Sequence, residues 1–253
     1  MEVSVRLIAV VLLVASASAG PSAQADTEVR VWTARAIATV LAEIGPQFEH
    51  ATGSKLIVTS DLSSGFARRL AAGEPVDVII SASTSMDEWI RDGRILVETR
   101  TDIARSGIGV GVREGAAKPD VGSAEAFKQA LLEAKSIAYL RVGSGVHVDK
   151  VIERLGIADA IKPKVTRPES DIVSELVSRG DVELGIVVIT QILTTPGVAF
   201  VGPLPAELQS HLTFTAGVSV NTRAAEASKQ LIRFLTGPAA KAVMRRQGME
   251  PGS

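Results

Sequence analysis

Short apolar stretches alternate with helical patterns along this chain, and this alternation constrains the fold more than any other feature. The first strands are expected at residues 28–32, 55–59 and 76–81. The first helices are expected at residues 36–52, 65–72 and 84–91. The third strand, VDVIIS, is apolar enough to be buried on both faces. The first helical pattern ends at Gly53, a typical C-terminal cap. Strand–helix repetition of this kind predicts an α/β fold with a mainly parallel sheet covered by helices on both sides.

The same alternation continues through the rest of the chain. Further strands are expected at residues 107–112, 136–140, 184–189, 198–201 and 212–220. Further helices are expected at residues 124–134, 146–155, 171–178, 224–235 and 238–247. A chain of 253 residues suits one large or two small domains, and two lobes fit this pattern better than one sheet. We expect lobe 1 to comprise residues 26–105 with 206–253, and lobe 2 to comprise residues 106–205. The crossing strands between the lobes are expected near residues 103–110 and 200–215.

Residues 1–25 have the features of a cleavable signal peptide. Arg6 provides a positive charge, and the apolar run at residues 7–14 is too short to span a bilayer of about 30 Å. Ala23-Gln24-Ala25 fits a cleavage site before Asp26, and a cut near residues 17–19 is an alternative. A buried N-terminal helix or a retained anchor fits less well, because small residues flank the run. The sequence predicts a periplasmic protein without a lipid anchor, since no cysteine is present.

Composition excludes several function classes. A net charge of −1 provides no electrostatic footprint for nucleic acid. The absence of cysteine removes thiolate metal sites and cysteine nucleophiles. The three histidines, His50, His147 and His211, are scattered, and no hydrolase motif or paired-carboxylate motif is visible. We therefore expect no enzymatic activity, no cofactor and no metal site, and we expect Asp77 to support structure.

The most specific motif lies at residues 63–82. A serine pair, Ser63-Ser64, stands before a short helix, and AGEPVDVIISA follows at residues 72–82. This order resembles that of the periplasmic molybdate-binding proteins of ABC importers, and weaker similarity continues at residues 147–156, 183–187 and 234–248. The resemblance implies a two-lobed type II periplasmic binding protein fold, with a ligand cleft between the lobes. It also implies an ABC transporter membrane permease as partner.

Candidate ligand-binding residues lie at the turns that lead from strands into helices. Open α/β sheets bind ligands at this edge, helix N-termini favour anions, and serine hydroxyls add directed donors. For Ser170, a helix cap is an equally good interpretation, and the turn at residues 143–145 is expected to offer backbone amides. Together with the resemblance, these turns identify the following candidates: Thr33, Arg35, Ala36, Ser63, Ser64, Arg141, Ser144, Gly145, Ser170, Ile172 and Val188.

Two of these positions depart from the family pattern. The molybdate binders carry a serine where Ala36 stands and a tyrosine where Val188 stands. Each missing hydrogen bond costs a buried oxyanion about 1–3 kcal/mol, so two losses would weaken binding by roughly a hundredfold. Arg35 and Arg141 lie in candidate turns, and a guanidinium suits a planar carboxylate; Arg167 is expected to be solvated. The sequence predicts a small anionic ligand, either a molybdate-type oxyanion or a small organic carboxylate.

Three functions remain open from the sequence. A transport receptor would close around its ligand and dock on an importer, and a periplasmic sensor would engage a signalling receptor in the same way. A periplasmic hydrolase would need a strongly perturbed acid or base in the cleft. A cytoplasmic regulator is disfavoured by the signal peptide and by the lack of a DNA-binding segment. A monomer is expected, because one-to-one docking suits a diffusing receptor.

Overall fold

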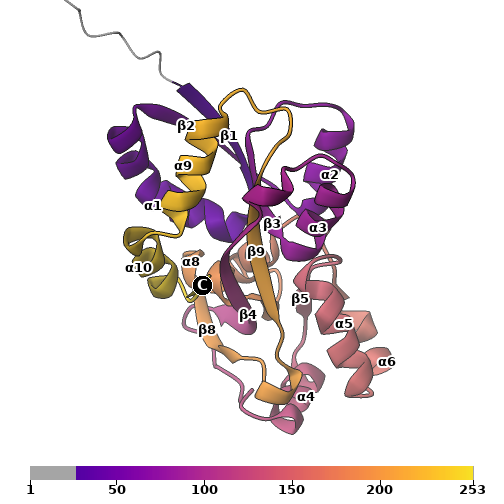
Figure 1. The fold of residues 1–253 in the computed structure, drawn as a ribbon. Helices are drawn as coiled ribbons and strands as arrows, with labels where there is room; N and C mark the ends of the chain where they lie inside the picture. Colours follow the sequence, from indigo (N-terminus) through magenta and orange to yellow (C-terminus); the bar gives the residue numbers. More distant parts are fainter. Residues whose placement is uncertain (1–26, 253) are drawn as a thin grey trace, which may run out of the picture.

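One mixed sheet runs through the computed structural model, which describes residues 27–252 (Figure 1). Its strands lie in the order β2-β1-β3-β9-β4-β7-β5-β6, and β8 and β10 also pair with β4. The strands are β1 (Thr27–Thr33), β2 (Ser54–Ser60), β3 (Val78–Ala82), β4 (Thr101–Arg113), β5 (Ile137–Tyr139), β6 (Val165–Thr166), β7 (Leu184–Val188), β8 (Val198–Pro203), β9 (His211–Val218) and β10 (Glu250–Pro251). The helices that cover them are α1 (Arg35–Thr52), α2 (Ser63–Ala71), α3 (Ser83–Arg91), α4 (Ala124–Glu133), α5 (Ser144–Arg154), α6 (Ala158–Ile161), α7 (Val173–Arg179), α8 (Ile189–Thr194), α9 (Ala225–Leu235) and α10 (Pro238–Arg246).

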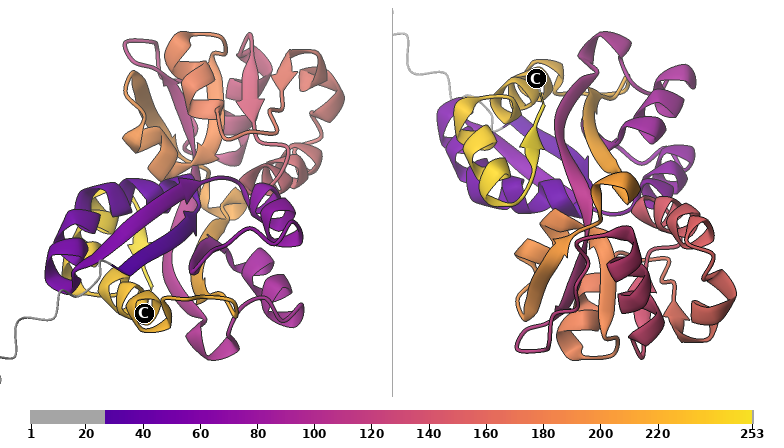
Figure 2. Two further views of the ribbon diagram at one scale, coloured as in Figure 1. Left: turned by 90° about the horizontal axis from the view of Figure 1, so that it is seen from above. Right: turned by 90° about the horizontal axis from the view of Figure 1, so that it is seen from below.

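Strand β4 joins the two halves of the molecule. Its first part pairs with β9, whereas residues 108–113 pair with β7 and β8. Figure 2 shows the beginning and the end of the chain gathered in one half and the middle of the chain in the other. The expected lobe boundaries at residues 105/106 and 205/206 stay a prediction.

In the half that contains β1 and α10, side chains alternate along the strands between two apolar cores. On β1, Val29 and Val31 face the helices α1, α9 and α10, while Trp32 faces α2 and α3. Trp32 stacks on Phe66 with ring centroids 5.7 Å apart. Because successive side chains of a strand point to opposite faces, the sheet is apolar on both sides and needs helices on both.

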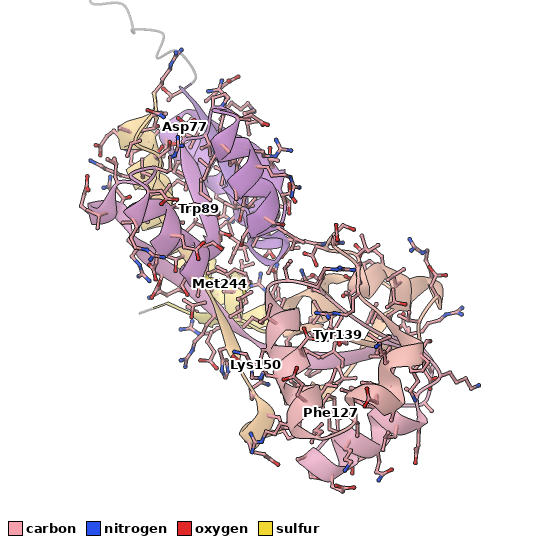
Figure 3. The ribbon with its side chains drawn as sticks, turned by 90° about the vertical axis from the view of Figure 1, so that its right-hand side faces the viewer. Asp77, Trp89, Phe127, Tyr139, Lys150 and Met244 are labelled. Carbon is pink, nitrogen blue, oxygen red and sulfur yellow. The ribbon has the colours of Figure 1, made fainter. Side chains whose placement is uncertain are left out.

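The other half has its own core. Val110 of β4 and Ile186 of β7 pack with α4 and α5 on one face, while Val187 packs with α7 and α8 on the other. Figure 3 shows Trp89 and Met244 in the first half and Phe127 and Tyr139 in the second. Each half therefore buries a separate set of apolar side chains.

Three helix starts differ by two residues from the sequence-based expectation. Helices α2 and α5 begin two residues earlier than predicted, so Ser63 and Ser144 are their first residues. Helix α7 begins later, at Val173, and Ser170 does not cap it. Its N-cap is Ile172, whose N–H donates to the carbonyl of Ser170 at 2.9 Å. The turn that contains Ser170 is therefore separate from helix α7, which begins at Val173.

The α/β fold class is confirmed, but the sheet is mixed where the chain crosses between the halves. Strands β2, β1 and β3 run parallel, as do β7, β5 and β6. Strand β9 runs antiparallel to both β3 and β4, and β4 runs antiparallel to β7. Because β4 leaves the first half and β9 returns to it, the two crossing strands have opposite directions.

The N-terminal segment at residues 1–25, interpreted as a signal peptide, lies outside the described residues. Among residues 27–252, every helix is too short or too polar to cross a bilayer.

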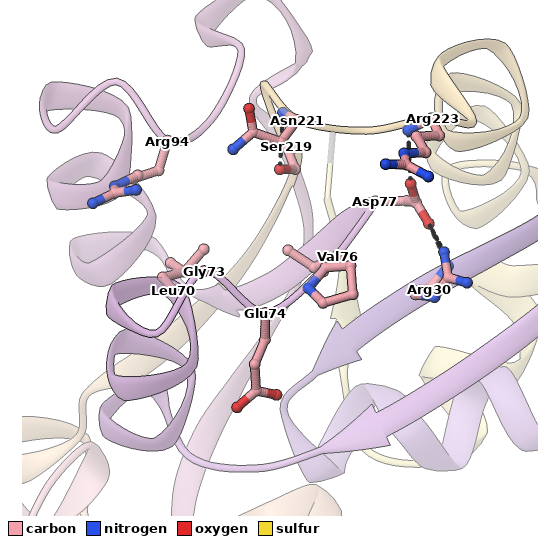
Figure 4. Close-up of a pocket in the computed structure, with 11 residues that line it drawn as sticks. Arg30, Leu70, Gly73, Glu74, Val76, Asp77, Arg94, Ser219, Asn221 and Arg223 are labelled. Atoms are coloured by element: carbon pink, nitrogen blue, oxygen red, sulfur yellow. Dashed lines mark hydrogen bonds and ion pairs between the residues drawn. The ribbon is translucent and has the colours of Figure 1, made fainter.

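Asp77 connects strand β3 to a neighbouring loop at the edge of the sheet opposite to the end of β3 at Ala82 (Figure 4). Its buried carboxylate accepts hydrogen bonds from Arg30 N at 2.8 Å, Thr222 Oγ1 at 2.7 Å and Arg223 N at 3.2 Å. This arrangement agrees with the structural interpretation of the residue.

Asp77→Ala is expected to lower the free energy of unfolding by about 2–3 kcal/mol, because three donors lose their acceptor. Urea denaturation measures this change. The exposed Asp92 is the matched control, since Asp92→Ala should change stability by less than about 0.5 kcal/mol. Equal stability of the two variants would contradict the structural role of Asp77.

Candidate functional site

A cavity of about 580 Å³ lies between the two halves, at the carboxyl ends of the strands. The turns that lead into α1, α2, α3, α5 and α8 line it. Leu212 and Phe214 of β9 add apolar surface. Ligands of open α/β sheets bind at this edge, so this cavity is the candidate site.

The helices that open onto the cavity lack side-chain caps. Their N-cap residues are Ala34, Leu62, Ala82, Gly143 and Val188. None of the five makes a side-chain capping hydrogen bond. Helices α7, α9 and α10 also lack a side-chain cap, whereas Ser123 caps α4 outside the cavity by accepting a hydrogen bond from Ala126 N at 3.1 Å. Uncapped first turns leave backbone N–H groups and the positive ends of helix dipoles at the cavity, which suits an anion.

Hydroxyl groups add donors from both halves. Ser64 and Thr84 lie in the first turns of α2 and α3, and Ser144 is the first residue of α5. Within residues 27–252, none of these three hydroxyls has a hydrogen-bond partner. Ser63 differs, because its Oγ lies 2.7 Å from the Oγ of the buried Ser81. These hydroxyl groups are therefore free, among the described residues, to bind a ligand.

Lys150 places a positive charge at the cavity. It is exposed on α5 near the narrow region where the halves meet (Figure 3), and it forms no ion pair with any described residue. His147 lies three residues earlier on the same helix, and its Nε2 donates to the carbonyl of Leu208 at 2.8 Å. An anion in the cavity would therefore meet an ammonium group that forms no ion pair with a carboxylate of residues 27–252.

Arg35 lines the cavity as expected, but the protein already engages its guanidinium. Its Nη1 donates to the carbonyl oxygen of Asp171 at 2.8 Å, and its Nη2 pairs with the Glu175 carboxylate. These contacts link α1 in one half to the start of α7 in the other. The side chain is a link between the halves rather than an open fork for a carboxylate ligand.

Asp171 lies in the cavity wall beside Arg35. Its Oδ2 accepts a hydrogen bond from Gln191 Nε2. Burial raises the pKa of Asp171 to about 6. The charge of Arg35 and the hydrogen bond from Gln191 lower this pKa, whereas the charge of Glu175 raises it. Because the folded state binds this proton more tightly than the unfolded state does, Asp171 lowers stability progressively as the pH rises from about 4 to about 6.

Ala36, Ser63, Ser64, Ser144 and Val188 also line the cavity. The sequence-based positions therefore converge on one site from both halves. Ala36 and Val188, the two departures from the molybdate-binding pattern, present apolar surface there.

Thr33 and Arg141 do not line the cavity. Thr33 is fully buried, and its Oγ1 donates to the carbonyl of Ala34 at 3.3 Å. Arg141 is exposed, and its Nε lies 3.6 Å from Glu169 Oε1. The expectation of an arginine fork from this residue is not met, because its side chain lies at the surface.

Ser170 and Ile172 lie beside the site rather than in it. Ser170 borders an adjoining hollow of about 530 Å³, which shares Arg35 and Asp171 with the main cavity. Ile172 is more than one-third exposed, at the N-cap of α7. Asp171, between them, is the residue that faces the main cavity.

Gly145 has a packing role. Its N–H donates to the carbonyl of Val142 at 3.1 Å, so this amide is not free for a ligand. A Cβ atom at this position would lie 1.7 Å from the carbonyl oxygen of Leu140. Glycine therefore allows α5 to pack closely against the chain that leaves β5.

Arg167, expected to be solvated, belongs to a cluster outside the cavity. Its Nη2 donates to Asp149 Oδ2 at 2.5 Å, and its guanidinium lies 5.1 Å from the centroid of the Tyr139 ring. Burial raises the pKa of Tyr139 to about 12, and the hydrogen bond to Asp149 adds to the rise. The cluster stabilises the second half.

Lys150, Asp171, Gln191 and Thr84 line the cavity although they were not among the candidates from the sequence. Lys150 had a detectable signal, because it shares a helix face with His147 and the Gly-rich turn. Thr84 begins a helix directly after a strand, which is the same signal that identified Ser63. Asp171 lies in the turn between the candidates Ser170 and Ile172, whereas Gln191 had no such signal, since its contact with Asp171 depends on how α8 packs.

Comparisons with known proteins agree with this geometry. The sequence model of the family described as bacterial extracellular solute-binding protein matches residues 29–250. The aconitate isomerase of a Pseudomonas species is 29% identical over 236 residues, which cover 91% of this chain and 90% of that protein. The molybdate-binding protein ModA of Escherichia coli K12 is 24% identical over 239 residues, which cover 92% of each chain. The solved periplasmic molybdate-binding protein of Azotobacter vinelandii has a TM-score of 0.75 at 21% identity, covering 87% of this chain and 98% of that one. The expected fold and the resemblance to molybdate-binding proteins are confirmed.

Proposed function

This chain belongs to the bacterial extracellular solute-binding protein family, and we propose that it captures a small organic polycarboxylate and delivers it to an ABC-type importer. The observation that carries the proposal is the set of uncapped helix N-termini around one cavity. Several partial positive charges from two halves suit a ligand that carries more than one negative group. Lys150 adds a full charge to the same surface.

An organic anion fits the lining better than a tetrahedral oxyanion. Ala36 and Val188 replace two hydroxyl donors of the molybdate-binding pattern, and Leu212 and Phe214 extend the apolar surface. A bare oxyanion would leave these surfaces in contact with charged oxygens, whereas a carbon skeleton can pack against them. The volume of about 580 Å³ is typical of sites for small organic molecules.

The relatives support the same choice. The Pseudomonas aconitate isomerase, at 29% identity, is named for a tricarboxylate, while the Escherichia coli molybdate-binding protein is 24% identical. A solved structure of PEB3 with TM-score 0.65 is described with bound L-phospholactate, which is an organic anion. We take trans-aconitate as the first probe for this reason.

The cellular setting is part of the proposal. A periplasmic receptor released from its signal peptide would bind as a monomer, close its halves around the anion and dock on a membrane permease. A periplasmic sensor would use the same site and differ only in its docking partner.

A second candidate function is isomerisation of the bound anion. Shifting a double bond in an unsaturated polycarboxylate moves one proton between two carbons, which needs a group that titrates near neutral pH. Asp171, with a pKa raised to about 6 mainly by burial, lies in the cavity wall and fits that requirement. Receptor and isomerase therefore differ in turnover, and not in the anion that they bind.

Thermal unfolding with a panel of anions tests the proposal. We expect trans-aconitate or a related di- or tricarboxylate to stabilise the protein by about 2.7 kcal/mol when present at about 100 times its dissociation constant. Molybdate, tungstate and sulfate should produce no shift. Stabilisation by molybdate alone would overturn the choice of ligand class. Proton NMR of trans-aconitate incubated with the protein should show no conversion for a receptor, whereas conversion would establish the second candidate.

A further inference from the structure

Asp171 is a negative group in a site that otherwise favours anions. It lines both the main cavity and the adjoining hollow. An ionised Asp171 would repel any anion that occupies the main cavity. A cation or a proton that neutralises Asp171 would remove this repulsion when the anion binds.

No cation is directed at its carboxylate within the described residues. Arg35, from α1, donates to the backbone oxygen of Asp171 and pairs with Glu175 instead. Among the described residues, the one side-chain hydrogen bond of the Asp171 carboxylate comes from the neutral amide of Gln191 on α8. The arginine is therefore not a direct partner of this carboxylate.

Other titratable groups face the same region from the neighbouring elements. Glu175 on α7 and Asp61 in the turn before α2 add negative charge, while Lys150 and His147 line the cavity from α5. Glu175 contributes to raising the pKa of Asp171, and burial contributes most. The local balance at Asp171 thus favours the neutral carboxylic acid once a further anion arrives.

The wall around Asp171 has an excess of acceptors. Gln191 is more than nine-tenths buried, and its Oε1 has no hydrogen-bond partner in the described part of the chain. The Oε2 atom of Glu175 is also buried without a partner. A proton on Asp171 would supply a donor where acceptors predominate.

We propose that Asp171 binds the anionic ligand in its protonated form and donates a hydrogen bond to it, so that ligand capture takes up a proton. This inference rests on the proposed function. It makes Asp171 a specificity-determining residue, because a neutral acid accepts an anion that a carboxylate would repel. Proton uptake and anion binding then strengthen each other by linkage.

The test compares the purified wild-type protein with Asp171→Asn, using trans-aconitate as the probe. For a group with a pKa of about 6, the protonated fraction falls about fiftyfold between pH 6 and pH 8, and the apparent affinity of the wild type should fall by the same factor. Asp171→Asn is always neutral and should change by less than about threefold. Ionisation of the probe itself affects both proteins equally.

Calorimetry at pH 7 in phosphate and in Tris buffer counts the protons taken up on binding. We expect about one proton per trans-aconitate for the wild type and none for Asp171→Asn. Asp159→Asn, an exposed change on α6, is the matched control and should retain both the pH dependence and the proton uptake. Without ligand, Asp171→Asn should unfold at a higher temperature than the wild type at pH 8 and at a similar temperature at pH 4.

The outcomes separate the two proposals. Binding of trans-aconitate with the same pH profile in wild type and Asp171→Asn, and without proton uptake, overturns the role of Asp171 and leaves the receptor proposal intact. Absence of binding at every pH overturns the polycarboxylate proposal and the inference with it. If the apparent affinity of the wild type falls about fiftyfold between pH 6 and pH 8, and only Asp171→Asn abolishes this fall, both proposals are supported.

Discussion

Ser144→Asp is expected to lower the affinity for trans-aconitate by at least about a hundredfold, while the protein remains folded. Ser144 is the first residue of α5, lines the cavity and is 5% exposed. A carboxylate at this position would occupy the space of the anion and repel it. An acidic residue in the first turn also favours the helix, so stability should not fall through loss of α5. Isothermal titration measures the affinity, and thermal unfolding verifies the fold.

Ser123→Asp is the matched control for this change. Ser123 has the same residue type at the start of another helix, but it caps α4 outside the cavity. Aspartate is an equally good cap, so affinity should stay within about threefold of the wild type. If Ser144→Asp also retained wild-type affinity, the anion would not bind at the N-terminus of α5, and the proposed site would be wrong.

Gly145→Ala is expected to lower the free energy of unfolding by about 3–5 kcal/mol, or to prevent folding. The added methyl group would lie 1.7 Å from the carbonyl oxygen of Leu140, a backbone atom that no side-chain rotation can move. Helix α5 would have to shift away from β5, which would also displace Ser144 and Lys150 in the cavity. Urea denaturation gives the loss of stability.

Gly122→Ala separates this steric effect from the general effect of replacing glycine. Its Cβ would have Asp120 Oδ1 as nearest neighbour, at 3.3 Å, and the residue is exposed. We expect a change of less than about 1 kcal/mol. Equal stability of the two variants would mean that α5 does not approach the backbone after β5 as closely as described.

The sequence by itself determined the elements and the edge of the sheet at which the site lies. Gly53 caps the end of α1 in the left-handed conformation, as its local pattern predicts, and Ser123 caps α4 through its side chain. Ala36, Ser64 and Val188 line the cavity because each belongs to a turn between a strand and a helix. Such features depend on residues that are close in the chain, and their periodicity or cap chemistry is visible without the fold.

Tertiary structure alone decided how the charged residues combine. Arg35 could be read as a carboxylate ligand until its contacts with Asp171 and Glu175 were known. Lys150, which was not among the candidates from the sequence, is the cation that remains without an ion pair at the cavity among residues 27–252. The mixed sheet has the same origin, since β4 and β9 cross between the halves in opposite directions. These outcomes depend on contacts between segments far apart in the chain. Local sequence encodes which groups a segment carries, whereas the packing of distant segments decides which of those groups neutralise one another and which remain free for a ligand.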